Sequence, residues 1–138
     1  MALSGDWYNE FGSHMHLTED ASGGITGSYV SAAGHAAGTY GVVGRSSAAP
    51  QAGQGTTVAW AVAWQNEGGN AGSVTSWSGQ YHADGPERIF ATWLLTRPTP
   101  LSDTWESTTV GQDVFTREAP DVQRVEAHRQ TGRPSSHP

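Results

Sequence analysis

Val58-Ala59-Trp60-Ala61-Val62-Ala63-Trp64 decides the fold, because its large and small side chains alternate strictly. Successive side chains of a β-strand point to opposite faces of the sheet. This stretch therefore places valine and tryptophan on one face and three alanines on the other. Ser73, Thr75 and Trp77 share one face of the next such stretch. Aromatic rings and hydroxyl groups on the same face are typical of a pocket for a small ligand with a polar head.

Alternating segments of this kind recur along most of the chain. The turns between them are rich in Gly, Ser, Asn and Pro, and such short connections favour antiparallel neighbours. Regularly spaced short strands are typical of a sandwich or an up-and-down barrel, and a closed barrel of about eight strands can hold one small ligand. We expect strands near 5–11, 15–20, 24–31, 38–45, 56–65, 73–83, 87–97 and 106–117.

Length and composition indicate one acidic globular domain. The chain has 138 residues, 18 of them glycine, a net charge of −6 and no lysine, so nucleic acid is not an expected partner. No apolar run approaches the ~20 residues of a membrane span. Cysteine is absent, which excludes disulfides and thiolate chemistry. No signal peptide is visible at the start of the sequence, as in a trimmed mature form.

The two ends of the chain differ in character. We assign residues 1–117 to the β domain and residues 118–138 to a C-terminal tail, which has no aromatic residue from 119 onward. The tail carries only a weak helical pattern, in Val122, Val125 and His128, so we expect it to be disordered, or a short helix at most. The alternative for this tail is docking near a pocket of another subunit.

Several dispersed stretches resemble the avidin/streptavidin family, in the same order and with near-constant spacing over residues 5–117. This family binds biotin in an eight-stranded antiparallel barrel, usually as a tetramer. The resemblance therefore implies an all-β, up-and-down (meander) β-barrel that binds biotin tightly in its open end and is not an enzyme. The stretches are Gly5-Asp6-Trp7-Tyr8-Asn9, Thr26-Gly27-Ser28-Tyr29, Val62-Ala63-Trp64, Thr75-Ser76-Trp77-Ser78-Gly79-Gln80-Tyr81, Thr92-Trp93-Leu94-Leu95-Thr96, Trp105-Glu106-Ser107-Thr108 and Gly111-Gln112-Asp113-Val114-Phe115.

The family's ligand residues fall on matching positions of this sequence. By resemblance, Asn9, Ser13 and Tyr29 donate to the ureido oxygen of biotin, and Ser31 and Asp113 accept from its two ring N–H groups. Thr75 lies by the sulfur, while Ser73 and the backbone at His35 meet the carboxylate. The resemblance further implies that tryptophans cage the ligand: Trp64, Trp77 and Trp93 from the same chain, and Trp105 from a neighbouring subunit.

The residue pattern agrees with this assignment. Asn9 and Ser13 share the parity of Trp7 and Phe11, and Asp113 shares that of Phe115. Three donors converging on one oxygen would favour negative charge on it, as in an oxyanion hole, and a carboxylate would add a charge-assisted bond. Asp6, Glu10, Glu19 and Asp20, in contrast, are interpreted as solvated charges.

Two positions differ from streptavidin, and outward-facing apolar residues bear on the assembly of subunits. His35 stands where streptavidin has Asn, so binding becomes pH-dependent if its ring turns inward. Gln112 replaces a His at a subunit interface. Outward-facing apolar residues near Val110 and Leu94 favour a buried interface between subunits. We expect a homotetramer, with a dimer as the alternative, and, by resemblance, a secreted bacterial protein.

Other classes of function fit the sequence less well than biotin binding does. A lipocalin-like carrier or a carbohydrate binder would use the same tryptophans, but the hydroxyls among them argue against a lipid cavity. An enzyme could pair Asp113 with His35, yet no nucleophile motif supports it. His14 and His16 share one face without an obvious third ligand, so no metal and no cofactor other than biotin as ligand is expected.

Overall fold

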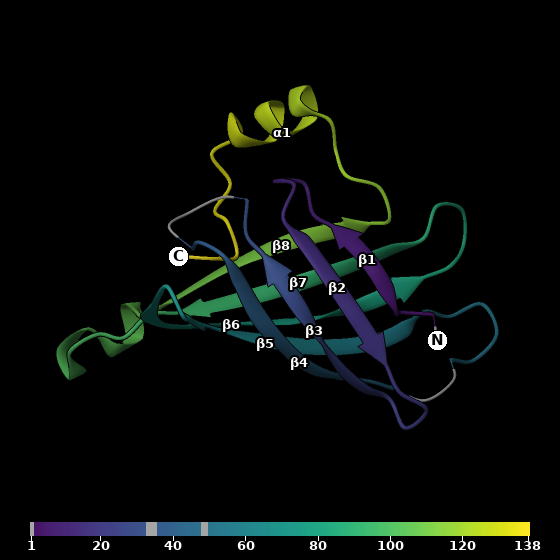
Figure 1. The fold of residues 1–138 in the computed structure, drawn as a ribbon, viewed down its shortest axis with the longest axis horizontal. Coiled ribbons are helices and arrows are strands. Elements are labelled where there is room, and N and C mark those ends of the chain that lie inside the picture. The colour runs from purple at the N-terminus through teal and green to yellow at the C-terminus, as the bar shows by residue number, and fades with distance from the viewer. Residues whose placement is uncertain (1, 33–35, 48–49) are drawn as a thin grey trace.

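Eight antiparallel strands form a closed barrel in chain order, which confirms the predicted up-and-down architecture. The computed structural model describes residues 2–32, 36–47 and 50–138, and Figure 1 shows the barrel side-on. Each strand pairs with the next, and the last returns to the first. The strands are β1 (Gly5–Tyr8), β2 (His14–Glu19), β3 (Gly24–Val30), β4 (Thr39–Ser46), β5 (Thr56–Asn66), β6 (Gly69–His82), β7 (Arg88–Thr96) and β8 (Thr108–Thr116).

The barrel interior is filled by the face that the alternation predicts. Val58, Trp60, Val62 and Trp64 are all buried, whereas Ala59 and Ala63 between them are exposed. The same alternation continues in β6 and β7, where Trp77 and Trp93 face each other across the strand pair. The core is therefore one continuous stack of inward side chains, as expected for a small barrel whose interior holds no channel.

The first strand ends earlier than the alternation predicts. The side-chain Oδ1 of Asn9 accepts the backbone N–H groups of Phe11 and Ser13 at 3.1 and 3.0 Å. Gly12 supplies the positive φ of 84° that this turn requires. These bonds satisfy the backbone in place of a strand ladder, so the chain turns over the barrel end instead of continuing as strand.

The seam between the last and first strands is short. β1 and β8 share only the register pair Tyr8↔Thr116. Beyond it, Glu10 Oε1 accepts the N–H of Val114 at 2.6 Å, and the Arg117 guanidinium lies 3.7 Å over the ring of Trp7. Side chains therefore extend the closure where the backbone ladder stops.

Two helical segments lie outside the barrel wall. The 3₁₀ helix η1 (Leu101–Glu106) connects β7 to β8, and α1 (Val122–Arg129) follows β8 with Asp121 capping its first turn. Figure 1 shows α1 above one end of the barrel, with the last residues turning back into that end. The tail, expected from its composition to be disordered or a short helix at most, thus contains a two-turn helix. None of the helices in the described part of the chain has the length and apolar character needed to cross a membrane.

Glycine on the inner face makes room for the largest rings. Gly111 pairs with Trp93 across β7 and β8, and a Cβ at position 111 would lie 2.2 Å from an atom of that indole. The ring is fully buried, and protein interiors are close-packed, so it can shift only if its neighbours shift as well. The interior thus depends on a small residue opposite a large one.

We predict that Gly111→Ala lowers the free energy of unfolding by about 1–3 kcal/mol, because the new methyl group forces Trp93 to shift. Denaturant unfolding followed by tryptophan emission measures it. Gly41→Ala is the matched control, since nothing lies within 4 Å of a Cβ at that strand position. Equal stability of the two variants would contradict this account of the packing.

Candidate functional site

The polar residues named from the sequence come together at one end of the barrel interior. Asn9 and Ser13 belong to the turn after β1, Thr75 to β6 and Asp113 to β8, and each is almost fully buried. Buried polar groups on an apolar inner face are costly unless they are paired. Their clustering from three separate segments marks this end as a candidate ligand site.

Aromatic rings form the walls beside these groups. Tyr29 contacts Trp64 edge-on, with centroids 5.7 Å apart, and is tilted against Trp77 at 5.4 Å. Trp60, the register partner of Trp77 on β5, stacks on it with ring centroids 5.5 Å apart. Trp93 is also fully buried. The rings are held by their neighbours, so the walls of the site are preformed.

The indole N–H groups orient the polar side chains. Trp64 Nε1 donates to Thr75 Oγ1 at 2.8 Å, and Trp77 Nε1 donates to Asp113 Oδ2 at 3.0 Å. Each tryptophan thus supplies both a wall and a fixed hydrogen bond. The Thr75 hydroxyl keeps its own hydrogen for another acceptor, and Asp113 keeps its second oxygen.

Asn9 and Tyr29 present donors toward the same region. The Oδ1 atom of Asn9 accepts from the turn, so its Nδ2 amide is the donor end, and it donates to the hydroxyl oxygen of Tyr29 at 3.4 Å. Burial, followed by the nearby charge of Asp113, raises the pKa of Tyr29 well above its ordinary value. Its hydroxyl therefore stays protonated and can donate to a ligand oxygen.

Asp113 is the acid of the site. Burial raises its pKa from the ordinary 3.8 to about 6, although the hydrogen bond from Trp77 acts in the opposite direction. Its Oδ1 atom has no hydrogen bond of normal geometry among the described residues, while Ser136 and Asn9 lie near enough to lower the pKa. A ligand N–H placed there would satisfy this oxygen.

Glu10 was wrongly interpreted as a solvated charge. It is half-buried, its Oε1 accepts the N–H of Val114, and burial raises its pKa. Its charge also contributes to the raised pKa of Asp113. The sequence contained no signal for this, because the contact joins residues at opposite ends of the barrel domain.

The end of the tail also lies inside the site, which sequence reasoning did not place there. Ser136 is 0% exposed and His137 is 2% exposed. The imidazole nitrogens of His137 lie 3.2 Å from Ser13 Oγ and 2.8 Å from Ser31 Oγ. Thr75 donates its hydroxyl hydrogen to the carbonyl of Ser136. The polar groups of the site are thus engaged by the protein's own chain.

Of the remaining candidate residues, Ser73 and Trp105 lie away from this cluster, and His35 is not among the described residues. The Ser73 hydroxyl is buried and points to the carbonyl of Ala71 at 3.4 Å. Trp105 is 96% exposed on η1, away from the interior of its own barrel. His35 lies outside the described residues, so its contact with a carboxylate, its effect on pH dependence and its pairing with Asp113 stay predictions.

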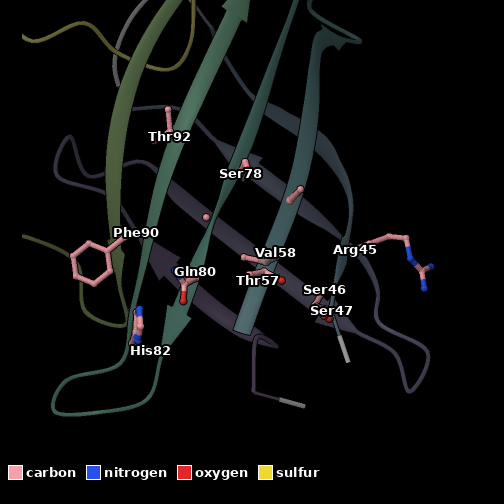
Figure 2. A pocket seen from close by; sticks show the side chains of 12 residues that line it. Arg45, Ser46, Ser47, Thr57, Val58, Ser78, Gln80, His82, Phe90 and Thr92 are labelled. Atoms are coloured by element: carbon pink, nitrogen blue, oxygen red, sulfur yellow. The ribbon is translucent and has the colours of Figure 1, made fainter. Parts of the chain in front are cut away.

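The outer face of the barrel carries hollows distinct from this site. The one in Figure 2 has a volume of about 700 Å³ and lies over the ends of β4 to β7. Its lining mixes outward residues such as Arg45, Gln80, His82 and Phe90. It has none of the buried polar groups of the interior end. We therefore assign ligand binding to the interior and treat this hollow as outer surface.

His14 and His16, the two candidate metal ligands, contact a carboxylate instead. His14 Nε2 and His16 Nδ1 each lie 2.8 Å from the same oxygen of Asp6. Hydrogen bonds with His16 and His14 lower the pKa of Asp6, an exposed carboxylate. No group of three or more ligating side chains suited to a metal ion occurs in residues 2–32, 36–47 and 50–138.

Comparison with known proteins agrees with the barrel and its inner site. The model of the Avidin family matches residues 1–118. The chain belongs to the avidin family. Members of this family are non-catalytic biotin binders that form oligomers, and the match covers every strand of the barrel and ends where the tail begins.

Two relatives show the range of proteins that carry this domain. Afifavidin of Afifella pfennigii is 33% identical over 119 residues, covering 83% of this chain and 69% of that protein. Fibropellin-1 of Strongylocentrotus purpuratus is 35% identical over 121 residues, also 83% of this chain. The chain spans only 11% of the length of fibropellin-1.

We predict that Asp113→Asn stabilises the fold at high pH. The folded-state pKa of about 6 exceeds the ordinary 3.8, so the charged carboxylate disfavours folding above pH 6 and the effect vanishes below about pH 4. The gain should reach up to about 3 kcal/mol at pH 8, measured by denaturant unfolding. Asp103→Asn, at an exposed carboxyl, is the control. An Asp113→Asn effect independent of pH would refute the assignment.

Proposed function

We propose that this protein binds biotin non-catalytically and with high affinity in the open end of its barrel. Asn9, Ser13 and Tyr29 donate hydrogen bonds to the ureido oxygen, and Ser31 and Asp113 accept from the ureido N–H groups. Trp64, Trp77 and Trp93 form a cage around the bicyclic ring. Thr75 lies by the sulfur, and Ser73 and the backbone at His35 meet the carboxylate.

The observation that carries this proposal is the pairing of donors and acceptors at the buried end. Asn9 Nδ2 is a donor, and the Tyr29 hydroxyl, which accepts from that amide, still has its own hydrogen to donate, while Asp113 Oδ1 has no hydrogen bond of normal geometry among the described residues. A urea offers one acceptor oxygen flanked by two N–H donors, which matches both requirements at once. A fatty-acid carboxylate offers acceptors but no N–H donor, and a sterol offers a single hydroxyl, so either ligand would leave part of this set unpaired.

We propose further that the protein assembles as a homotetramer, with a dimer as the alternative. Leu94 and Val110 face each other on the outside of β7 and β8 and are 47% and 61% exposed. Val43, Val74 and Phe90 extend the exposed apolar surface. In the assembly, Trp105 would close the pocket of a neighbouring subunit, since its ring is solvent-exposed in the single chain.

The proposal includes secretion, by analogy with the family. No turnover is expected, because the buried groups are arranged to hold a ligand by hydrogen bonds and the described residues of the site include no activated nucleophile.

We predict that biotin binds one site per chain and changes tryptophan emission, because Trp64 and Trp77 line the site. Tyr29→Phe should weaken binding about 10- to 100-fold, since it removes one buried donor without changing ring volume. Isothermal titration provides the measurement. Tyr8→Phe is the matched control, because Tyr8 stacks on His14 on the outer face of the barrel.

Desthiobiotin should bind more weakly than biotin if Thr75 and the tryptophans enclose the sulfur-bearing ring. Equal affinity for the two ligands would remove that part of the assignment. No heat and no spectral change with biotin, in both the native protein and Tyr8→Phe, would refute biotin as the ligand.

We predict that light scattering shows an oligomer at micromolar concentration and that Leu94→Glu combined with Val110→Glu dissociates it. Like charges directly opposite on paired strands would be buried against the partner, which is costly. The matched control is Thr18→Glu combined with Thr26→Glu, an exposed cross-strand pair of β2 and β3. A monomeric native protein would contradict the assembly.

A further inference from the structure

The backbone ladder between the first and last strands stops just before it reaches the candidate site. β1 and β8 run antiparallel side by side (Figure 1), with Tyr8 opposite Thr116, so a ladder continued by two residues would bring Glu10 opposite Val114. The main chain leaves β8 before that point, because the turn held by Asn9 carries it across the barrel end. The N–H of Val114 therefore lies beyond the last register pair of the seam.

The side chain of Glu10 replaces the backbone that is missing there. Its Oε1 atom accepts the N–H of Val114 at 2.6 Å, a short distance of the kind found when the acceptor is an ionised carboxylate. A carboxylate oxygen accepts a backbone N–H as a strand carbonyl would, and it extends further from its own main chain. The seam is thus lengthened by a hydrogen bond past the point where the strands part.

This hydrogen bond holds the peptide group that carries Asp113. The N–H of Val114 belongs to the peptide between Asp113 and Val114, which is planar, so fixing that N–H restrains the main chain on one side of the Asp113 Cα. The register pair Ala91↔Asp113 holds the same residue from β7. Trp77 then orients one carboxylate oxygen inside the barrel. Asp113 is therefore held from both neighbouring strand positions, and Glu10 supplies the hold on the β1 side.

Glu10 also lies close enough to Asp113 to affect its charge. Burial is the main cause of the raised pKa of Asp113, and the like charge of Glu10 adds to it. Burial raises the pKa of Glu10 as well, whereas the hydrogen bond from Val114 and the charge of Arg133 lower it. Other titratable or charged groups around this pair come from four segments: Tyr29 of β3, His128 of α1, Arg133 after α1 and His137 near the end of the chain.

We propose that Glu10 is a positioning residue for the acceptor Asp113, because its side chain completes the seam at Val114 and so fixes where the Asp113 carboxylate meets an N–H donor. Glu10 acts through Val114 and through its own charge, not by contact with the ligand. The effect on a ureido ligand rests on the proposed function, whereas the hold on Val114 and Asp113 does not.

The first experiment needs no ligand and measures the amide hydrogen exchange of Val114 by NMR, relative to the amides of β6. Glu10→Ala should speed this exchange about tenfold or more, since it removes the acceptor. Glu10→Gln keeps a side-chain oxygen and should preserve the native protection. Glu19→Ala is the matched control, because Glu19 is also half-buried and accepts a backbone N–H, that of Leu3 at 3.3 Å. Unchanged protection of Val114 in Glu10→Ala would overturn the proposal.

The second experiment follows the titration of the Asp113 carboxyl carbon by NMR, its signal being assigned by comparison with Asp113→Asn. Glu10→Gln removes a charge and keeps the hydrogen bond, so the titration midpoint of Asp113 should lie below that of the native protein. A purely structural role of Glu10 would not move this midpoint. Glu19→Gln should leave it at the native value. The same midpoint in Glu10→Gln and the native protein would overturn the influence of Glu10 on this charge.

The third experiment measures biotin affinity by competition calorimetry at about pH 8 and about pH 5, on either side of the Asp113 titration. At the higher pH, Glu10→Ala should bind about tenfold more weakly or worse, while Glu10→Gln and Glu19→Ala stay within about threefold of the native protein. At the lower pH the native protein should lose affinity, because a protonated Asp113 is a poorer acceptor. Glu10→Gln should lose less, since its Asp113 stays ionised to lower pH.

The outcomes separate this proposal from the proposed function. Native affinity in Glu10→Ala would leave biotin binding intact and overturn the positioning role of Glu10. Absence of biotin binding in every protein, the native one included, would refute biotin as the ligand, and the Val114 exchange and the Asp113 titration would still decide the role of Glu10. Glu10→Gln, which keeps the hydrogen bond, decides the charge effect if Glu10→Ala does not fold.

Discussion

The closure of the barrel at the β8–β1 seam is the constraint on which the site depends. Asn9 and Ser13 come from the start of the chain and Asp113 from its last strand, so they meet only if that seam is shut. The backbone contributes one register pair, and Glu10 accepts the N–H of Val114 beside it. Arg117 donates to three carbonyls of the first strand region while lying over Trp7. An open seam would expose strand edges and separate the halves of the site. The interior chemistry therefore depends on side-chain contacts of Glu10 and Arg117 at this seam.

Inside the closed wall, stability and ligand binding use the same side chains. The tryptophans that fill the barrel also orient Thr75 and Asp113 through their indole N–H groups. Trp77 donates to one oxygen of the Asp113 carboxylate, and the other oxygen has no hydrogen bond of normal geometry among the described residues, so a bound donor would satisfy it. Burial, the main cause of the raised pKa of Asp113, makes the charged carboxylate costly in the folded protein. A site of this kind is selective because a ligand without a donor for Asp113 would leave the buried carboxylate oxygen unpaired.

The strands and the inward face were predictable because both follow from local alternation. In β5 the alternation over residues 58–64 is enough to place Trp60 and Trp64 on the inner face, and the structure confirms this placement. The polar residues of the site required the family resemblance, since a serine or threonine on a sheet face is ordinary. Three features could be predicted neither from the local alternation nor from the family resemblance. The early end of β1 depends on one amide of Asn9, the burial of Glu10 on a contact with Val114, and the place of His137 on a pocket assembled from distant strands. A tail without hydrophobic periodicity gives no sign of such polar complementarity.

The contacts of the tail follow from the cost of the polar interior. A pocket lined by buried donors and acceptors is costly unless these groups are paired. The imidazole of His137 lies within hydrogen-bond distance of Ser13 and Ser31, and the carbonyl of Ser136 accepts from Thr75. Polar groups of the same chain therefore relieve part of that cost without burying a large apolar surface.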